Sequence, residues 1–124
     1  MKTIIATLLV LFLSIPAAMA GSVTGKGVWC PKDDVIEESF GFWFEEEKAL
    51  RIFLQGYVVS TDDYNYQEET NVIVIGVDWK LDRRTLMLAI LNKLDRQCYL
   101  ATSYDELVAK LEDISAAAEA KNKI

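Results

Sequence analysis

Hydrophobic residues alternate with other residues over several short stretches of the chain, and this period predicts β-strands. Between residues 40 and 44 every second position is a phenylalanine, so three aromatic rings lie on one face of a strand. The polar residues 45–47 interrupt the pattern, which resumes over 49–54. Together the two stretches predict an antiparallel pair of strands joined by a charged turn.

Further strands are predicted at 57–59 and at 72–75, where four β-branched residues follow one another. Gly76 permits a kink after this run, and we expect the same strand to continue to Trp79. The intervening residues 61–66 are rich in Asp and Asn, which predicts a turn.

Residues 85–94 fit two patterns. Alternate positions from Leu86 to Ile90 form one face of a strand, whereas Met87 and Leu91 belong to a helical stripe, and the Leu, Met and Ala residues favour helix by propensity. We predict a strand, because a short connection then returns the chain to a last strand at 97–100.

A helix is predicted near the C-terminus. Ser103 and Glu106 have the spacing of a capping box, in which a hydroxyl begins the helix and a carboxylate three residues later bonds back. Leu107, Leu111 and Ile114 then form a one-sided apolar stripe. The fold class that follows is mainly β (α+β): a curved antiparallel sheet of five or six strands, open or partly closed into a barrel, with one C-terminal amphipathic helix.

The first twenty residues have the layout of a secretory signal peptide. Lys2 supplies a positive start, residues 3–13 are mostly apolar, and Ala18-Met19-Ala20 offers a small-residue cleavage site. The apolar run is shorter than the roughly 20 residues that span a bilayer, so we expect a periplasmic or secreted protein with no membrane anchor after cleavage. The expected organisation is a signal peptide at 1–20, a flexible leader at 21–28, a single disulfide-tied domain at 29–115 and a frayed helical tail at 116–124.

The acidic balance of the chain narrows the choice of partners. The chain has 13 Lys and Arg against 19 Asp and Glu, a net charge of −6, which becomes −7 once Lys2 leaves with the first twenty residues. Such a surface disfavours nucleic acids and anionic lipid headgroups, and it is compatible with a cationic protein partner.

The only cysteines are Cys30 and Cys98, and exported proteins meet an oxidising environment. We predict a disulfide between them, which in the chain-entropy model contributes roughly 4 kcal/mol of stability. A metal site or a catalytic thiol is the weaker alternative, because the chain has no histidine.

The absence of histidine also removes the commonest neutral-pH base and any Ser-His or Cys-His pair. No glycine-rich phosphate loop occurs. Carboxylates such as those at 45–47 are expected to be solvated, so a carboxylate-based hydrolase is disfavoured. The oxygen-rich segment 62–69 lacks the spacing and glycine of an EF-hand. We therefore predict no catalytic residue, no metal site and no cofactor.

Four residues are candidates for ligand binding. Trp43 and Trp79 could line a pocket for an apolar ligand, although aromatic residues at strand spacing more often form the core. Trp43 also stands opposite the face that the three phenylalanines share. Arg83 and Arg84 could clamp an anionic group, with a solvated turn as the alternative.

Several short motifs of this chain occur together in a known group of proteins. They are Cys30, Gly41-Phe42-Trp43-Phe44-Glu45, Arg51, Leu81-Asp82-Arg83-Arg84-Thr85-Leu86, and Gln97-Cys98 ahead of a charged C-terminal helix. The series resembles a group of small exported proteins of marine bacteria, over most of the chain after the first twenty residues. That group has no assigned activity, so the resemblance implies no site residue; it does imply a strand after Asp82.

Taken together, these features favour an exported, non-enzymatic binding module for a protein or a small ligand. Two more specific versions are a lipocalin-like carrier of a small apolar ligand and a lysozyme-inhibitor-like protein. The cationic target of the latter would be attracted by the negative charge of the chain.

Overall fold

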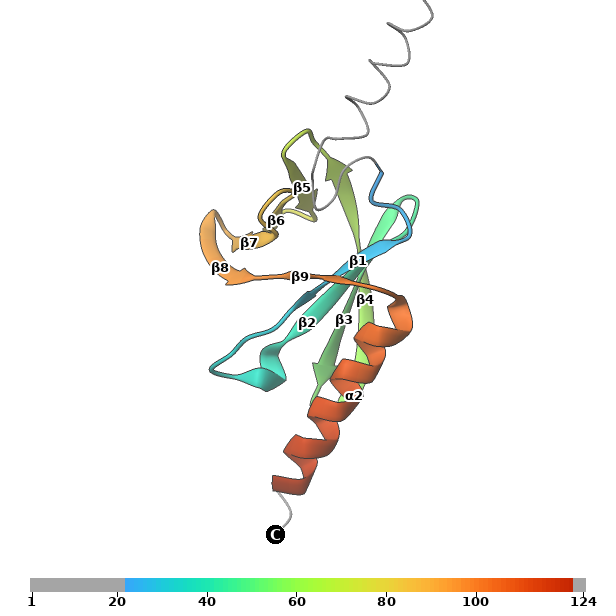
Figure 1. Cartoon of the computed structure of the whole chain (residues 1–124), viewed down its shortest axis with the longest axis vertical. Helices are drawn as coiled ribbons and strands as arrows, with labels where there is room; N and C mark the ends of the chain where they lie inside the picture. The colour runs from blue at the N-terminus through green and yellow to red at the C-terminus, as the bar shows by residue number, and fades with distance from the viewer. Residues whose placement is uncertain (1–21, 122–124) are drawn as a thin grey trace, which may run out of the picture.

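The first eight strands follow one another in the sheet in the order of the sequence, and the ninth pairs with the first. In the computed structural model, which describes residues 22–121, every strand pair is antiparallel and the sheet order is β8-β7-β6-β5-β4-β3-β2-β1-β9 (Figure 1). The elements are β1 (Lys26–Cys30), the 3-10 helix η1 (Ile36–Glu38), β2 (Phe40–Phe44), β3 (Lys48–Gln55), β4 (Val58–Glu68), β5 (Val72–Ile75), β6 (Trp79–Asp82), β7 (Met87–Ile90), β8 (Lys93–Gln97), β9 (Tyr99–Ala101) and α2 (Tyr104–Lys121).

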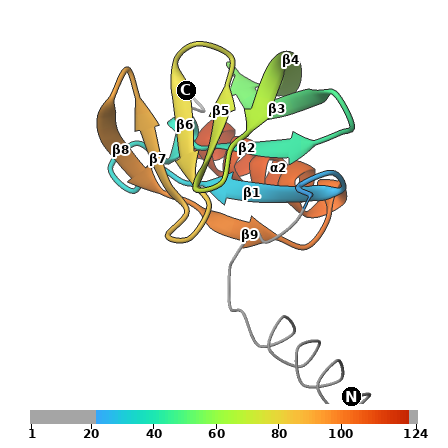
Figure 2. The ribbon, with the colours of Figure 1, turned by 90° about the horizontal axis from the view of Figure 1, so that it is seen from above.

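The end of this meander lies beside its start. Only Cys98 separates β8 from β9, and β8 pairs with β7 whereas β9 pairs with β1. Seen from above, the strands surround a common centre, and the sheet is a nearly closed barrel (Figure 2). The antiparallel sheet and the C-terminal helix confirm the predicted fold class. The described part of the chain has nine strands, however, so the prediction of five or six was wrong.

One reason for the difference is the conformation of Gly76. Its φ of 58° starts a tight turn with Val77 and Asp78, so that Ile75 and Trp79 face each other across the β5–β6 hairpin. The prediction of one strand continuing through Gly76 was therefore wrong. Alternating apolar residues on the two sides of a tight turn have the same pattern as a single kinked strand, and only the backbone angle distinguishes them.

The polar segment 61–66 is the second reason, because it forms the middle of β4, the longest strand, and not the predicted turn. Asp62, Tyr64 and Tyr66 are half-buried, whereas the residues between them are exposed. Pairing with β3 runs without a break from Lys48 to Gln55. The hydrogen bonds of this ladder and the packing of the tyrosines outweigh the turn preference of Asp and Asn.

The strand predicted within 85–94 is confirmed. β7 and β8 enclose a two-residue turn at Leu91 and Asn92, whose φ values of 53° and 65° reverse the chain. Leu88 is fully buried on the inner face of β7.

Aromatic side chains fill the middle of the barrel. Phe40, Phe42 and Phe44 are all buried, as their alternation predicted. Phe42 contacts the edge of Trp79 with ring centroids 5.5 Å apart, and Phe44 contacts Tyr66 at 5.3 Å. Edge-to-face pairs at these distances add stability to the burial of apolar area.

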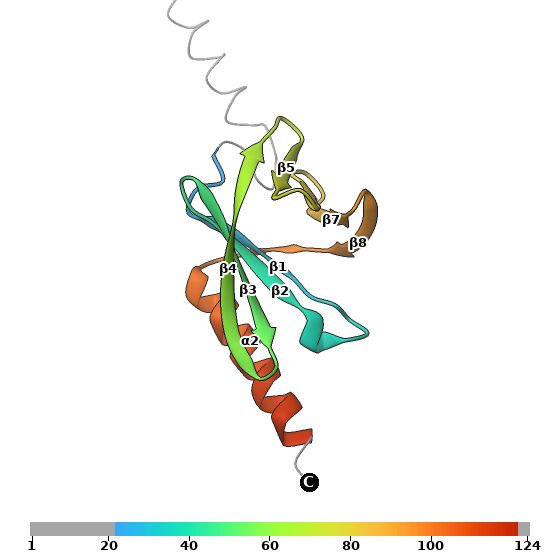
Figure 3. The same ribbon diagram turned by 180° about the vertical axis from the view of Figure 1, so that it is seen from behind.

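A second, smaller core lies outside the barrel, where α2 covers β2, β3 and β4 (Figures 1 and 3). Leu107 and Leu111 of α2 are fully buried against this outer face. Trp43, which points away from the three phenylalanines, packs against Tyr104 with ring centroids 6.4 Å apart. The strands under the helix are therefore apolar on both faces.

The start of α2 follows the predicted capping pattern in part. The Oγ of Ser103 accepts a hydrogen bond of 3.1 Å from the N–H of Glu106, as an N-cap residue does. The Glu106 carboxylate reaches the N–H and the hydroxyl of Thr102 and not the N–H of Ser103. These two donors lower the pKa of Glu106.

The predicted disulfide is confirmed: it joins Cys30, at the end of β1, to Cys98. Within the segment expected as a leader, β1 begins at Lys26, and the N–H of buried Val23 donates a 2.9 Å hydrogen bond to Glu68. The expected signal peptide and residues 122–124 lie outside the described residues. No helix within 22–121 combines the length and the apolar character needed to cross a membrane.

Candidate functional site

A pocket of about 290 Å³ opens to solvent at the end of the barrel where β1 leads into η1. Its walls come from η1, β3 and β8. We call it the arginine pocket, because Arg51 and Arg96 are its two cationic residues. Its lining residues are Glu37, Glu38, Ser39, Phe40, Arg51, Phe53, Leu54 and Arg96.

Arg51 enters the pocket from inside the barrel. Its neighbour in the sheet register is Asp62, whose Oδ1 accepts a hydrogen bond of 3.1 Å from Nε and whose Oδ2 accepts one of 2.9 Å from Nη2. The guanidinium carbon lies 4.2 Å from the ring centre of Phe53 and 5.4 Å from that of Trp79. A bidentate ion pair and two aromatic faces therefore fix this side chain, which is 22% exposed.

Tyr64 extends the Arg51–Asp62 pair. Its hydroxyl donates a 2.8 Å hydrogen bond to Oδ2 of Asp62. Burial of the ring and this bond raise the pKa of Tyr64, with burial the larger cause. The three side chains form one polar row across β3 and β4, surrounded by aromatic rings.

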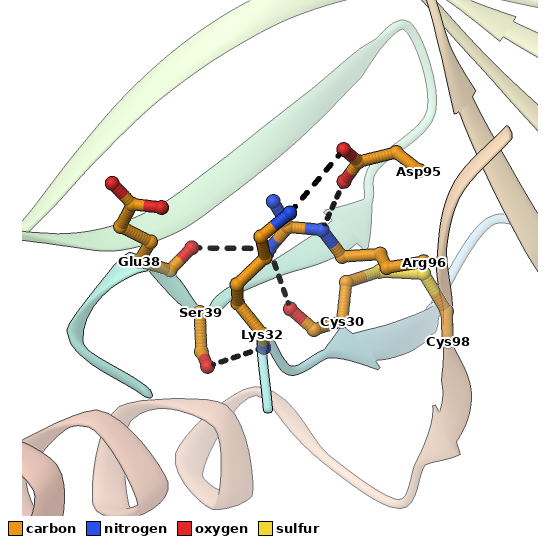
Figure 4. A network of polar contacts seen from close by, with 7 residues as sticks. All are labelled: Cys30, Lys32, Glu38, Ser39, Asp95, Arg96 and Cys98. Carbon is orange, nitrogen blue, oxygen red and sulfur yellow. Dashed lines mark hydrogen bonds and ion pairs between the residues drawn. A yellow bond between two sulfur atoms is a disulfide. The ribbon is translucent and has the colours of Figure 1, made fainter. Parts of the chain in front are cut away.

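Arg96 reaches the pocket from β8 (Figure 4). Its Nε donates a 2.5 Å hydrogen bond to Asp95, and its Nη1 donates to the carbonyl oxygens of Cys30 at 3.2 Å and Glu38 at 3.0 Å. Its guanidinium carbon also lies 4.4 Å from the ring centre of Phe40. This side chain, 9% exposed, thus ties η1 to the disulfide-bonded end of β1.

The segment between β1 and η1 has further anchors in the same network (Figure 4). The N–H of Lys32 donates a 2.9 Å hydrogen bond to Oγ of Ser39, and Nζ of Lys32 lies 3.7 Å from Asp95. Ser39 is buried, so this bond satisfies a hydroxyl that would otherwise be costly to bury. The η1 wall of the pocket is accordingly held in place.

These contacts leave part of each guanidinium unused. Among residues 22–121, Nη1 of Arg51 and Nη2 of Arg96 have no hydrogen-bond partner. Every fully buried side-chain nitrogen or oxygen of those residues does have a partner, so the two unused nitrogens must be in contact with solvent. Both residues line the arginine pocket, so these two nitrogens are its candidate donors.

The structure does not bring the four predicted ligand-binding residues together. Trp43 lies beneath α2 on the outer face of the sheet, whereas Trp79 packs inside the barrel against Phe42. Of the four, only Trp79 lies next to the arginine pocket, through its contact with Arg51.

The two predicted arginines lie in the turn between β6 and β7, and Arg83 reaches from there to the β4–β5 turn. Nη1 of Arg83 donates a 2.8 Å hydrogen bond to the carbonyl oxygen of Glu69, and Nη2 lies 3.8 Å from Glu68. Arg84 is exposed, and its backbone N–H bonds to Asp82. Arg83 thus fastens a turn, and the two side chains do not form an anion clamp with one another.

Asp82 organises the turn that precedes β7. Its Oδ1 accepts hydrogen bonds from the N–H groups of Arg84 at 2.8 Å and Thr85 at 2.9 Å. Stabilisation of the carboxylate by these two donors, first that of Thr85, lowers the pKa of Asp82.

Sequence reasoning did not select Arg51 and Arg96. A signal for Arg51 was its place in β3, on the same side as Phe53 and opposite the apolar Leu50 and Ile52. For Arg96, in the polar strand β8, no comparable signal exists, because only barrel closure brings it next to Phe40.

Two other depressions are open to solvent. One of about 400 Å³ lies between the β3–β4 turn and α2, beside Tyr57 and Glu119. The other, of about 500 Å³, lies beside Tyr64, Val77 and Trp79. Neither is lined by an arginine or a lysine, so the arginine pocket has the stronger polar recognition groups.

Asp62 and Asp63 of β4 point to different sides of the strand. Asp62 faces Arg51, whereas Asp63 faces Lys48, whose Nζ lies 2.9 Å from Oδ2. The hydrogen bond between Lys48 and Asp63 raises the pKa of the lysine and lowers that of the aspartate. No set of three acidic or cysteine side chains within 22–121 is arranged to hold a metal ion.

Comparison with known proteins identifies no relative of this chain. No protein-family model matches the sequence, and neither the curated proteins nor the solved structures contain a similar protein at a significant level.

Proposed function

We propose that the chain is an exported, non-enzymatic binding module that holds the anionic group of a small molecule in the arginine pocket. The observation that carries the proposal is the presence of unused, solvent-accessible guanidinium nitrogens on both Arg51 and Arg96. Guanidinium groups match the geometry of carboxylate and phosphate. A pocket of about 290 Å³ lies at the small end of the range for ligand sites and suits a metabolite-sized molecule.

Both arginines are already fixed before a ligand arrives. Asp62 and the ring of Phe53 hold Arg51, while two carbonyl oxygens and the ring of Phe40 hold Arg96. Little side-chain freedom therefore remains to be lost on binding, which favours affinity in a small site.

The aromatic packing inside the barrel favours this site over a lipocalin-like cavity. Phe42, Phe44 and Trp79 contact other rings in the middle of the barrel. The space proposed for a ligand is instead the arginine pocket at the end of the barrel. The disulfide supports an exported location, because such bonds persist in oxidising compartments.

The test is a calorimetric titration of the purified protein with benzoate, 4-methylpentanoate and inorganic phosphate at millimolar concentrations. We expect at least one of these anions to bind. Tryptophan fluorescence should respond, because the ring of Trp79 lies 5.4 Å from the Arg51 guanidinium carbon.

Arginine variants locate the site. Arg51→Gln and Arg96→Gln should each weaken binding roughly tenfold, the loss of one charge-assisted hydrogen bond. Arg84→Gln is the matched control, because it removes the same charge from an exposed side chain outside the pocket. If Arg51→Gln does not fold, Arg51→Lys replaces it in the binding measurement. Binding that is absent for all three anions, or that survives both pocket variants, contradicts the proposal.

A further inference from the structure

We propose that the natural ligand of the arginine pocket is a zwitterion, a free α-amino acid with an apolar side chain. This inference rests on the proposed function and specifies its ligand. It comes from the charge distribution around the pocket, in which acidic and basic side chains occupy different walls.

The η1 wall carries Glu37 and Glu38, both exposed. Nη1 of Arg96 bonds the main-chain oxygen of Glu38, and the Glu38 carboxylate takes no part in the network of Figure 4. Within 22–121, neither glutamate side chain has a hydrogen bond or an ion pair. The position of this wall is therefore fixed through the backbone, while its two carboxylates stay available.

Opposite charges thus line one small pocket without pairing. No ion pair joins either glutamate to Arg51 or Arg96, although all four residues line it. A ligand that carries both charges can bridge this separation, with its carboxylate against the arginines and its ammonium against the glutamates. The ligand carboxylate accepts a charge-assisted N–H bond from the one nitrogen that each arginine has left, Nη1 of Arg51 or Nη2 of Arg96. The ammonium supplies three donors for the carboxylate oxygens of the glutamates.

Ligands with a single charge fit the same walls less well. A simple anion would gain the arginines but would face repulsion from Glu37 and Glu38, and the partner carboxylates of the arginines, Asp62 and Asp95, add to this. A simple amine would gain the contacts with Glu37 and Glu38 but would face repulsion from Arg51 and Arg96. Such unfavourable like-charge contacts are a means of discriminating between ligands.

The remaining side chains that line the pocket are mostly apolar. They are Phe40 of β2 and Phe53 and Leu54 of β3. A side chain such as that of leucine can cover these groups and exclude water from the charged contacts. An apolar α-amino acid therefore matches all three kinds of wall.

Calorimetry with three related probes tests the inference. L-Leucine carries both charges, 4-methylpentanoate lacks the ammonium group, and 3-methylbutylamine lacks the carboxylate. We expect leucine to bind roughly tenfold more tightly than the carboxylate alone, and the amine to show no saturable binding.

The double variant Glu37→Gln/Glu38→Gln isolates the contribution of the η1 wall. It should reduce leucine binding to the level of 4-methylpentanoate and leave binding of 4-methylpentanoate unchanged or stronger. Glu46→Gln/Glu47→Gln is the matched control, because it removes the same charge from exposed side chains in the β2–β3 turn and should leave the leucine affinity unchanged.

The outcomes separate the two proposals. Equal affinity for leucine and 4-methylpentanoate, with both dependent on Arg51 and Arg96, overturns the zwitterion inference and keeps the anion-binding function. Leucine binding that does not change in Glu37→Gln/Glu38→Gln also overturns the inference. Failure of every probe to bind overturns both.

Discussion

Leu107 of α2 rests directly on Gly41 of β2. A Cβ atom at Gly41 would lie 2.7 Å from Cδ2 of Leu107 and 3.1 Å from the carbonyl oxygen of Val28. The lack of a side chain at this position therefore lets the helix approach the sheet and bury Leu107 and Leu111.

Gly41→Ala should lower the free energy of unfolding by about 1–3 kcal/mol, because the added methyl group overpacks the contact between helix and sheet. Urea denaturation followed by circular dichroism measures the change. Leu107→Ala alone should cost about 2–5 kcal/mol, as a large-to-small substitution in a core.

The double variant is the control for this contact. Its destabilisation should be smaller than the sum of the two single effects, because the methyl group at position 41 then occupies part of the space that Leu107 leaves. Strict additivity, or a neutral Gly41→Ala, contradicts the proposed packing.

Removal of the disulfide should be costly. Cys30 and Cys98 are separated by 68 positions, and they connect β1 to the corner between β8 and β9, where the barrel closes. Cys30→Ala/Cys98→Ala should lose about 2–5 kcal/mol of unfolding free energy. The reduced wild-type protein is the control, since equal losses assign the effect to the covalent bond and not to the packing of the two sulfur atoms. A variant as stable as the oxidised protein contradicts this prediction.

The N-cap of α2 offers a milder test. Ser103→Ala removes the acceptor for the N–H of Glu106 and should cost about 1 kcal/mol. Ser103→Asp keeps a side-chain oxygen at the same position and should retain most of the stability. Equal losses in the two variants would mean that the capping bond does not stabilise the helix.

The parts of the fold that followed from the sequence are those with a local physical cause. Alternating phenylalanines in β2 marked the inner face of a strand, and Ser103 marked the start of a helix. The strand count was wrong because Gly76 reverses the chain and because pairing with β3 holds the polar residues 61–66 in an extended strand. Both depend on backbone angles or on distant partners, which local pattern does not contain.

The candidate site depends still more on distant partners. Arg51 and Arg96 belong to different strands, and closure of the barrel places both beside Phe40, at 5.8 and 4.4 Å from their guanidinium carbons. Arg83 and Arg84 were adjacent in the sequence and therefore more visible, yet the fold uses Arg83 to fasten a turn. Adjacency in sequence was thus a poor guide to convergence in space.

Tyr64 gives the structure a specific response to alkaline pH. Burial and the hydrogen bond to Asp62 raise the pKa of Tyr64 in the folded state, so folding favours the neutral phenol. The stability that this group contributes is fully present below the unfolded pKa of about 10 and is lost as pH rises through the folded pKa. Tyr64→Phe keeps the ring, whose centroid lies 4.8 Å from that of Trp79, and removes the titrating hydroxyl.

We therefore expect Tyr64→Phe to be about 1 kcal/mol less stable than the wild type at neutral pH, because one hydrogen bond is lost. The difference should shrink above about pH 10, since only the wild type must then bury a phenol that has begun to ionise. Urea denaturation at neutral and at alkaline pH measures both quantities. Tyr99→Phe, at an exposed position, is the matched control and should follow the wild type throughout. If the stability difference between Tyr64→Phe and the wild type stays constant with pH, ionisation of the Tyr64 hydroxyl is not the cause of the loss of stability at alkaline pH.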